Sequence, residues 1–158
     1  MNSFKIKNKF IVGLGSWLNE LPLSGKESRE RTRFVSLLVD RLTEVEKFRT
    51  DLLEKHVKKD EKGEKKKVMI EEQEIWDMTP ENQVSYGKEL TDLMDEEFVI
   101  DVLEGNKEKV KVVKNIVLNT SYVFGPKEGD SIEEKNAKIR QMNDYNIWCE
   151  SFDAVTIE

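Results

Sequence analysis

The longest regular pattern of apolar positions runs through residues 24–57. Apolar side chains recur there at alternating steps of three and four, with one interruption at Arg49, and this spacing predicts a single long amphipathic helix. Ser24 and Glu27 have the spacing of a capping box, which predicts the start of the helix. The stripe is wide enough for packing inside a domain and also suits a helix seam in an oligomer. It consists of Val35, Leu38, Leu42, Val45 and Leu52, widened by Phe34, Phe48 and Leu53.

A second helix is predicted from Asn8, a suitable N-cap, to the residue before Pro22. Gly13 and Gly15 lower its helix propensity by about 1 kcal/mol each, so we expect them to allow close approach of a neighbouring helix. The connection to the long helix is short, which predicts an antiparallel helical hairpin over residues 1–60. The apolar face is formed by Phe10, Leu14, Trp17, Leu18 and Leu21.

The segment after the long helix is rich in lysine. Residues 58–67, KKDEKGEKKK, predict a solvated turn centred on Gly63. Residues 67–75 have no helical stripe and are predicted to be an exposed strand or an irregular arm.

One short run is typical of a β-strand. Residues 98–103, FVIDVL, combine β-branched and aromatic side chains. We expect this strand to pair with residues 68–70 as a two-stranded ribbon. Residues 1–7 form either a short strand or a lead into the first helix.

Three further segments are predicted to be helical. Thr79 and Pro80 mark the start of a helix that ends near Glu96. Asn106 is the expected N-cap of the next helix, although its many valines make a strand an alternative. The last helix begins with the capping-box pair Ser131 and Glu134. The three stripes are Val84, Leu90, Leu93 and Met94; Val110, Val113, Ile116 and Val117; and Ile132, Met142, Tyr145, Trp148, Cys149 and Phe152.

These patterns together predict a mainly α fold. It consists of an antiparallel helical hairpin, two or three shorter helices and a minor two-stranded β element. At 158 residues the chain is predicted to be a single domain, 1–158. Its parts are the hairpin at 1–60, a turn with the β ribbon and a short helix at 61–104, and the C-terminal helices at 105–158.

The amino-acid composition limits the kinds of partner that we expect this protein to bind. The net charge of −6, from 26 basic and 32 acidic residues, disfavours nucleic acid. Apolar residues make up 37% of the chain and charged residues another 37%, which fits a helical protein with thin apolar stripes and much solvated surface, or one that completes its core by forming a homo-oligomer. No apolar run approaches the roughly 18 residues of a membrane span, so no membrane association is expected and the cytoplasm is the expected location.

The sequence offers few candidate catalytic residues. The sequence has no Walker-type glycine loop, no HExxH and no GxSxG. Its one cysteine, Cys149, is expected to be a buried inert thiol, and only His56 could serve as its base. A zinc site would need several carboxylates besides this one histidine. We therefore expect no enzyme, no catalytic residue, no metal and no cofactor.

The start of the long helix carries the best candidate binding site. Lys26, Arg29 and Arg33 are spaced three and four apart and share one side of the helix. A helix N-terminus offers unpaired backbone donors, and arginine can hold a phosphate bidentately. These residues predict a phosphate site. Glu27 and Glu30 in the same turns leave a plain solvated helix start as the alternative.

Aromatic side chains in or beside turn-rich segments are the second candidate. Trp76, Tyr86 and Tyr122 could stack on a planar ligand. The alternative is that these rings cover short helices in a protein with little core.

Six segments taken together resemble a known family. They are IKNKFIVGL at 6–14, LSGKESRERTRF at 23–34, EKHVKKDEKGE at 54–64, LTDLMDEEFVID at 90–101, VVKNIVLNT at 112–120 and YNIWCESF at 145–152. In this order the chain resembles a small family of unknown function from tailed phages, of siphovirus type, of Gram-positive bacteria. The resemblance implies a viral, homo-oligomeric accessory protein in the host cell cytoplasm. Residues 127–144 depart from it, being longer than is typical of the family.

Two classes of function follow as expectations. The first is a non-enzymatic counter-defence protein that sequesters a nucleotide-type immune signal of the host, with Lys26, Arg29 and Arg33 on the phosphates, or blocks a host defence protein. The second is a virion-associated or tail-assembly protein that acts through helical protein–protein contacts.

Overall fold

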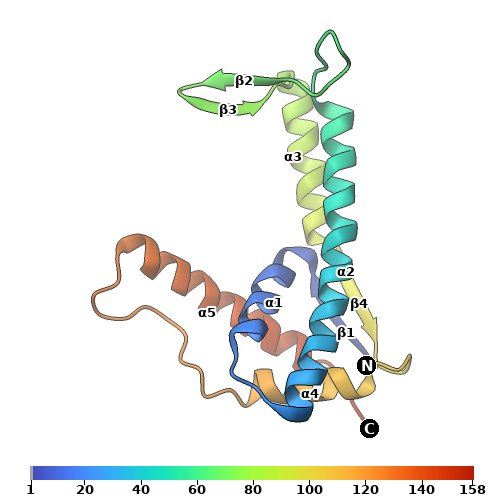
Figure 1. Cartoon of the computed structure of the whole chain (residues 1–158), viewed down its shortest axis with the longest axis vertical. Helices are drawn as coiled ribbons and strands as arrows, with labels where there is room; N and C mark the ends of the chain where they lie inside the picture. The colour runs from blue at the N-terminus through green and yellow to red at the C-terminus, as the bar shows by residue number, and fades with distance from the viewer. Residues whose placement is uncertain (1) are drawn as a thin grey trace. The chain divides into compact units, whose positions relative to one another are not determined.

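The computed structural model describes residues 2–158 and has the mainly α fold with minor β structure that the sequence predicts (Figure 1). The chain forms two compact units, one containing the residues up to Leu42 together with Glu97–Glu158, the other Thr43–Glu96. That these units form one domain stays a prediction. In chain order the elements are β1 (Ser3–Lys7), the 3-10 helix η1 (Asn8–Phe10), α1 (Ile11–Glu20), α2 (Gly25–His56), β2 (Lys67–Ile70), β3 (Gln73–Trp76), α3 (Pro80–Asp95), β4 (Glu97–Asp101), α4 (Lys107–Leu118) and α5 (Ile132–Asp153).

Three phenylalanine rings mark the centre of the first unit. Phe4 of β1 lies 4.5 Å from Phe152 of α5 and 5.6 Å from Phe34 of α2, measured between ring centroids. Phe34 and Phe152 are themselves 5.8 Å apart, and all three side chains are fully buried. Each ring comes from a different element, so this contact joins the two ends of the unit's sequence to the long helix.

Strands β1 and β4 form an antiparallel pair, with Phe4 opposite Ile100 and Lys7 opposite Glu97. Phe4, Ile6 and Ile100 are buried, which fixes the register because a slip of one residue would turn the apolar side chains to solvent. The prediction that residues 98–103 pair with residues 68–70 is wrong, because β4 pairs with β1 in a sheet of two strands. Of the two alternatives for residues 1–7, the strand is confirmed.

Helix α1 and the first half of α2 form the predicted antiparallel hairpin. The Arg31 guanidinium donates to the carbonyl oxygens of Leu18, at 2.9 Å, and Leu21, at 2.7 Å, and so satisfies the C-terminal end of α1. At the other end, Arg41 Nε donates to Asn8 Oδ1 at 2.9 Å. Later residues of α2 thus meet earlier residues of the first helical segment, as an antiparallel pair requires.

The glycines of α1 allow close packing, as predicted. A Cβ atom at Gly13 would lie 3.2 Å from Cζ2 of Trp148, on α5. A Cβ at Gly15 would lie 3.7 Å from Leu38, on α2. Helix α1 is therefore packed between two helices, and the tighter contact is with α5.

Helices α4 and α5 complete the first unit. The valine-rich α4 is a helix and not the alternative strand, and its whole predicted stripe is buried. Asn106 stands at the N-cap, but its side chain makes no capping bond and donates instead to the Asp101 carbonyl oxygen. The Ser131–Glu134 capping box is confirmed. The predicted stripe of α5 is wrong at two positions. Ile132 is 77% exposed, because the first turns of α5 extend beyond α1 (Figure 1), and Met142 is also exposed.

The second unit holds the end of α2, the lysine-rich turn, the β2–β3 hairpin and α3. Gly63, with φ of 79°, lies in the turn, and its N–H donates to the Asp60 carbonyl oxygen. Strands β2 and β3 pair with each other, which is why residues 68–70 are not available to β4. At the start of α3, Thr79 Oγ1 accepts from the Asn82 N–H at 3.1 Å, as its N-cap role predicts.

Two apolar residues predicted to face a core in this unit are exposed. Val84 of α3 is 74% exposed, and Phe48 of α2 is also exposed, while Val45 and Leu93 are buried. The unit is small, so its helices bury only part of their stripes. No helix within residues 2–158 is both long enough and apolar enough to cross a membrane.

A matched pair of substitutions tests the role of Arg31. We expect Arg31→Met to lower the free energy of unfolding by about 2 kcal/mol, because two carbonyl oxygens lose a charged donor. Arg29→Met, on the same helix at an exposed position, is expected to change it by no more than about 0.5 kcal/mol. Urea unfolding followed by circular dichroism measures both, and equal losses would contradict the assignment.

Candidate functional site

The three cations predicted to hold a phosphate take different neighbours. Lys26 Nζ lies 2.5 Å from Glu108 Oε1 on α4. Arg33 Nη1 lies 2.5 Å from Glu30 Oε1, whose residue is only 6% exposed. Arg29 is exposed and has no ion pair or hydrogen bond within residues 2–158. The structure shows no contact that unites these side chains. Lys26 lines a groove.

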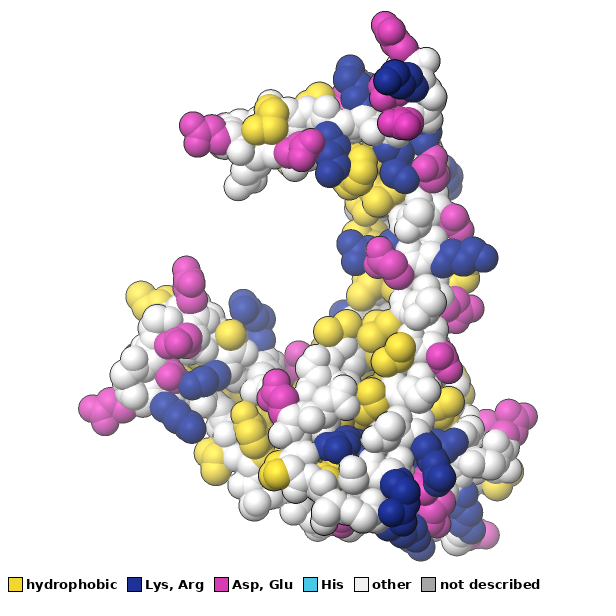
Figure 2. Space-filling view, in the orientation of Figure 1, with side chains coloured by type: hydrophobic (Ala, Val, Ile, Leu, Met, Phe, Trp, Pro, Cys, Tyr) yellow, Lys and Arg dark blue, Asp and Glu magenta, His cyan; other side chains and the backbone are white. Residues whose placement is uncertain are grey.

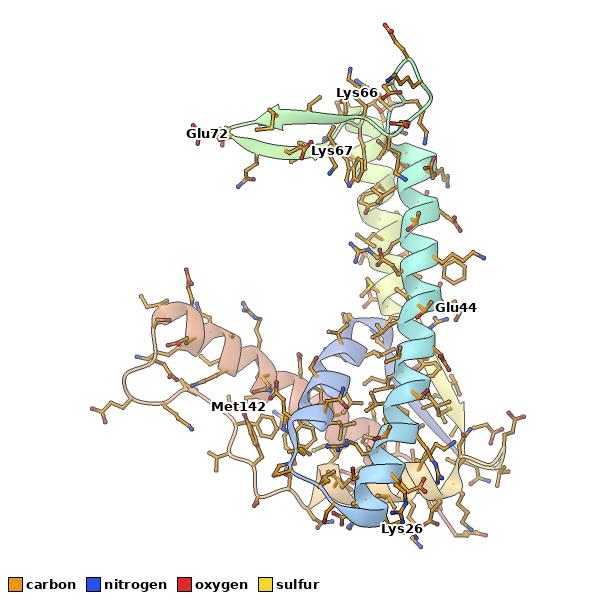
Figure 3. All side chains as sticks on the ribbon, in the orientation of Figure 1. Lys26, Glu44, Lys66, Lys67, Glu72 and Met142 are labelled. Carbon is orange, nitrogen blue, oxygen red and sulfur yellow. The ribbon has the colours of Figure 1, made fainter. Side chains whose placement is uncertain are left out.

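That groove lies between the start of α2 and the exposed side of α4, within the first unit, and has a volume of about 540 Å³. We call it the α2–α4 groove. Lys26, Lys111 and Lys114 line it, and we call their ammonium groups its rim. The half-buried apolar side chains of Val112, Leu118 and Ile157 also line it, and we call them its floor. Figure 3 labels Lys26 at the start of α2, and Figure 2 shows basic side chains gathered beside acidic ones over this part of the molecule.

The lysines of the groove differ in how far their charge is compensated. Lys26 holds the pKa of Glu108 below its usual value, first by a hydrogen bond and then by its charge, with Lys111 and Lys107 adding to the effect. Lys114 Nζ donates to the Val155 carbonyl oxygen at 2.8 Å and, among the described residues 2–158, has no paired acid. Lys111 is exposed and makes no ion pair within residues 2–158. The groove therefore keeps positive charge at Lys111 and Lys114.

Two amides extend the binding capacity of the groove. Asn115 and Asn119 line it, and the Asn119 side chain donates to Asn115 Oδ1 at 2.8 Å. Ammonium groups and amides above an apolar floor can hold a small molecule that has both an anionic and an apolar part. The volume lies in the range of about 300–1,000 Å³ that is usual for small-molecule sites.

The residues of α4 were not predicted as site residues. Lys111, Asn115 and Asn119 are spaced four apart, which places them on one side of the helix. This spacing could have indicated a polar binding face. It could not have indicated that Lys26, about 85 positions earlier in the sequence, lies across from it.

The predicted stacking residues each contact a neighbour of their own. Lys67 Nζ lies 4.6 Å from the centre of the Trp76 ring, and Tyr86 meets His56 edge-on at 6.3 Å. Tyr122 belongs to the other unit, where it contacts the ring of Phe124 at 4.7 Å. That these rings stack on a planar ligand stays a prediction.

The two residues considered for nucleophilic chemistry lie in different units. Cys149 is half-buried beside Tyr145, whose pKa is raised to about 12 by burial and by the neighbouring thiol. His56 is buried in the second unit, with its Nε2 3.1 Å from Glu89 Oε1. Within residues 2–158 no three His, Cys, Asp or Glu side chains group together as a metal site would require. The absence of enzymatic activity stays a prediction.

Comparison with known families gives one match. Residues 2–128 match the model of a family described as protein of unknown function (DUF1617). The chain belongs to the DUF1617 family. No curated protein and no solved structure matches it. The DUF1617 match includes every residue of the α2–α4 groove except Ile157 and stops before α5.

The Lys26–Glu108 pair in this DUF1617 protein can be tested by titration. We expect Lys26→Gln to raise the pKa of Glu108 toward its usual value, because the hydrogen bond and the positive charge that lower it are lost. NMR titration of the side-chain carboxyl carbon measures this shift. Arg29→Gln serves as the control and should leave the pKa of Glu108 unchanged.

The sign of the linked stability effect follows from the direction of the shift. Since the folded pKa of Glu108 lies below the unfolded one, the pair stabilises the fold above the unfolded pKa. This contribution is lost as the pH falls from the unfolded pKa through the folded one, and it should be absent at every pH in Lys26→Gln. An unchanged Glu108 titration in that variant would contradict the pairing.

Proposed function

We propose that this DUF1617 protein is a non-enzymatic accessory protein of a tailed phage of Gram-positive bacteria, and that it counters host defence in the host cell cytoplasm. It acts by sequestering a nucleotide-type immune signal in the α2–α4 groove. The observation that supports this proposal is the combination, in one groove, of lysine ammonium groups and an apolar floor.

The parts of a nucleotide match the parts of the groove. Its phosphates are bound by Lys111 and Lys114, which make no ion pair with an acidic residue in the described part of the chain. Its base packs on the floor formed by Val112, Leu118 and Ile157, and the amide of Asn115 supplies hydrogen bonds to the base edge. This arrangement replaces the site predicted from Lys26, Arg29 and Arg33, of which only Lys26 is retained.

Charge limits how tightly such a ligand is held. Three lysines line the groove against two glutamates, Glu27 and Glu108, so the lining has an excess of one positive charge. Glu108 already pairs with Lys26, and a phosphate that reaches Lys26 has to compete with this carboxylate. We therefore expect Lys111, which makes no ion pair within residues 2–158, to contribute more to binding than Lys26 does.

The lining of the groove is compatible with the proposed binding role. It contains no histidine, cysteine or serine, which are the usual nucleophiles and general bases. Its carboxyl group at Glu108 has a lowered pKa and so stays ionised at neutral pH, which makes it unsuited to act as a general acid.

A virion-associated or tail-assembly role is the second candidate. It is favoured by exposed apolar side chains on the β2–β3 hairpin, where Met69 is 65% exposed and Ile70 is 53% exposed. Large apolar side chains that are grouped at an exposed site commonly mark a protein–protein contact. In this case the protein would co-purify with virions.

Thermal unfolding in the presence of ADP-ribose derivatives and cyclic dinucleotides tests the first proposal. A bound nucleotide at 100 times its Kd should stabilise the protein by about 2.7 kcal/mol. Lys111→Glu should weaken binding about tenfold, because a phosphate contact is replaced by a repulsive charge. Lys107→Glu is the control, since Lys107 is exposed one turn earlier on α4 and does not line the groove.

Two results would reject this function. One is the absence of a thermal shift with every nucleotide, combined with recovery of the protein from purified virions. The other is a nucleotide shift that Lys111→Glu and Lys107→Glu reduce equally, because the ligand would then bind outside the groove. Turnover of a nucleotide would show that the protein is an enzyme.

A further inference from the structure

The tip of the β2–β3 hairpin combines exposed apolar side chains with acidic ones. Met69 and Ile70 are the last two residues of β2, and both are more than half exposed. Glu71 and Glu72 follow them and form the two-residue turn, where Figure 3 labels Glu72. We call these four residues the hairpin tip. They present two apolar groups and two negative charges to solvent.

The turn has an unfavourable sequence for its backbone. Glu71 has φ of 50° and Glu72 has φ of 66°, so both residues lie in the left-handed region. A two-residue hairpin turn with positive φ at both positions is of type I′, which strongly favours Asn-Gly or Asp-Gly. Glutamate brings a steric penalty at each position, and such strain is common where the side chains have a function.

The hairpin also has little packing of its own. No residue of β2 or β3 is fully buried, although Val68, Ile75 and Trp76 are half-buried. A two-stranded hairpin is only marginally stable in water without further packing. Burial of the tip against another surface would provide the apolar contacts that the hairpin lacks.

We propose that the hairpin tip of one copy of this protein inserts into the α2–α4 groove of a second copy. Ile70 packs on the apolar floor, and Met69, its neighbour on β2, points to the opposite face of the hairpin. Glu71 and Glu72 lie beside the ammonium groups of Lys26 and Lys111. The tip and the groove match in both polarity and charge. The tip combines two apolar groups with two negative charges, and the groove combines an apolar floor with a positively charged rim.

This contact is heterologous, because the tip and the groove are different surfaces. Each copy therefore has one tip and one groove, and the assembly either closes as a ring or extends as an open chain. The inference goes beyond the proposed function and does not require a nucleotide. Because both use the same groove, a bound nucleotide is expected to compete with the tip and to shift the assembly toward monomers.

Reciprocal charge reversal tests this contact on the full chain. Glu71→Lys with Glu72→Lys gives a basic tip, and Lys111→Glu with Asn115→Asp gives an acidic groove without altering Lys26 or Glu108. Each double variant alone should have a self-association constant weakened about tenfold or more, since like charges then face each other. An equal mixture of the two should recover assembly, because the acidic tip of one meets the basic groove of the other. Analytical ultracentrifugation over a range of concentrations measures this.

Two control variants separate the contact from general effects. Glu61→Lys with Glu128→Lys changes the net charge by the same amount as the basic-tip variant, at exposed positions away from the tip and the groove, and should leave assembly unchanged. Glu71→Asn with Glu72→Gly supplies the residues that the turn favours. This variant should unfold at the same or a higher temperature than the wild type and still assemble more weakly, which a purely structural role for the glutamates would not produce.

The outcomes are distinguishable from those of the nucleotide test. A wild-type chain that stays monomeric at all concentrations overturns the contact, as does assembly that survives either double variant or that mixing does not restore. The basic-tip variant keeps its own groove intact, so it should still give a thermal shift with a nucleotide. Restored assembly on mixing without any nucleotide shift would support the contact and reject the proposed function.

Discussion

The contact among Phe4, Phe34 and Phe152 is the interaction on which the first unit depends. These rings come from β1, α2 and α5, and they lie within 6 Å of one another, at 4.5 to 5.8 Å between centroids, in a fully buried position. Aromatic side chains bury more apolar surface than other residues, which matters in a chain where only 37% of residues are apolar. With β1 held in this way, β4 can pair with it and lead directly into α4.

The placement of α4 decides where the candidate site forms. Its buried valines, such as Val113 and Val117, pack inward, so the opposite side with Lys111 and Asn115 stays exposed. Lys26 at the start of α2 reaches Glu108 on α4. The groove is thus a consequence of core packing: the apolar side of α4 fixes which polar residues face the start of α2.

The second unit buries few apolar side chains, among them Val45, Val57 and Leu93. Val84, Met69 and Ile70 are all more than half exposed, and the turn at the end of its hairpin carries glutamates in the left-handed region. Favourable local sequence elsewhere in this unit, such as the Thr79 cap, shows that good capping and turn residues are present where the fold alone requires them. An unfavourable turn beside exposed apolar residues is consistent with a surface that acts by contact.

The sequence by itself determined the helices and their ends, because periodicity, capping boxes and proline positions act over a few residues. It predicted α1, α2, α3 and α5 with their approximate bounds, and the close approach at Gly13. Only the tertiary structure decided that β4 pairs with β1, and that Lys26 meets α4 while Arg33 binds Glu30. Strand pairing and the meeting of charged side chains depend on contacts between residues that are distant in the sequence. The chain contains many lysines and glutamates, and their local sequence does not show which of them will form a pair. The buried core chooses among them, since it sets which surfaces of which helices are brought together.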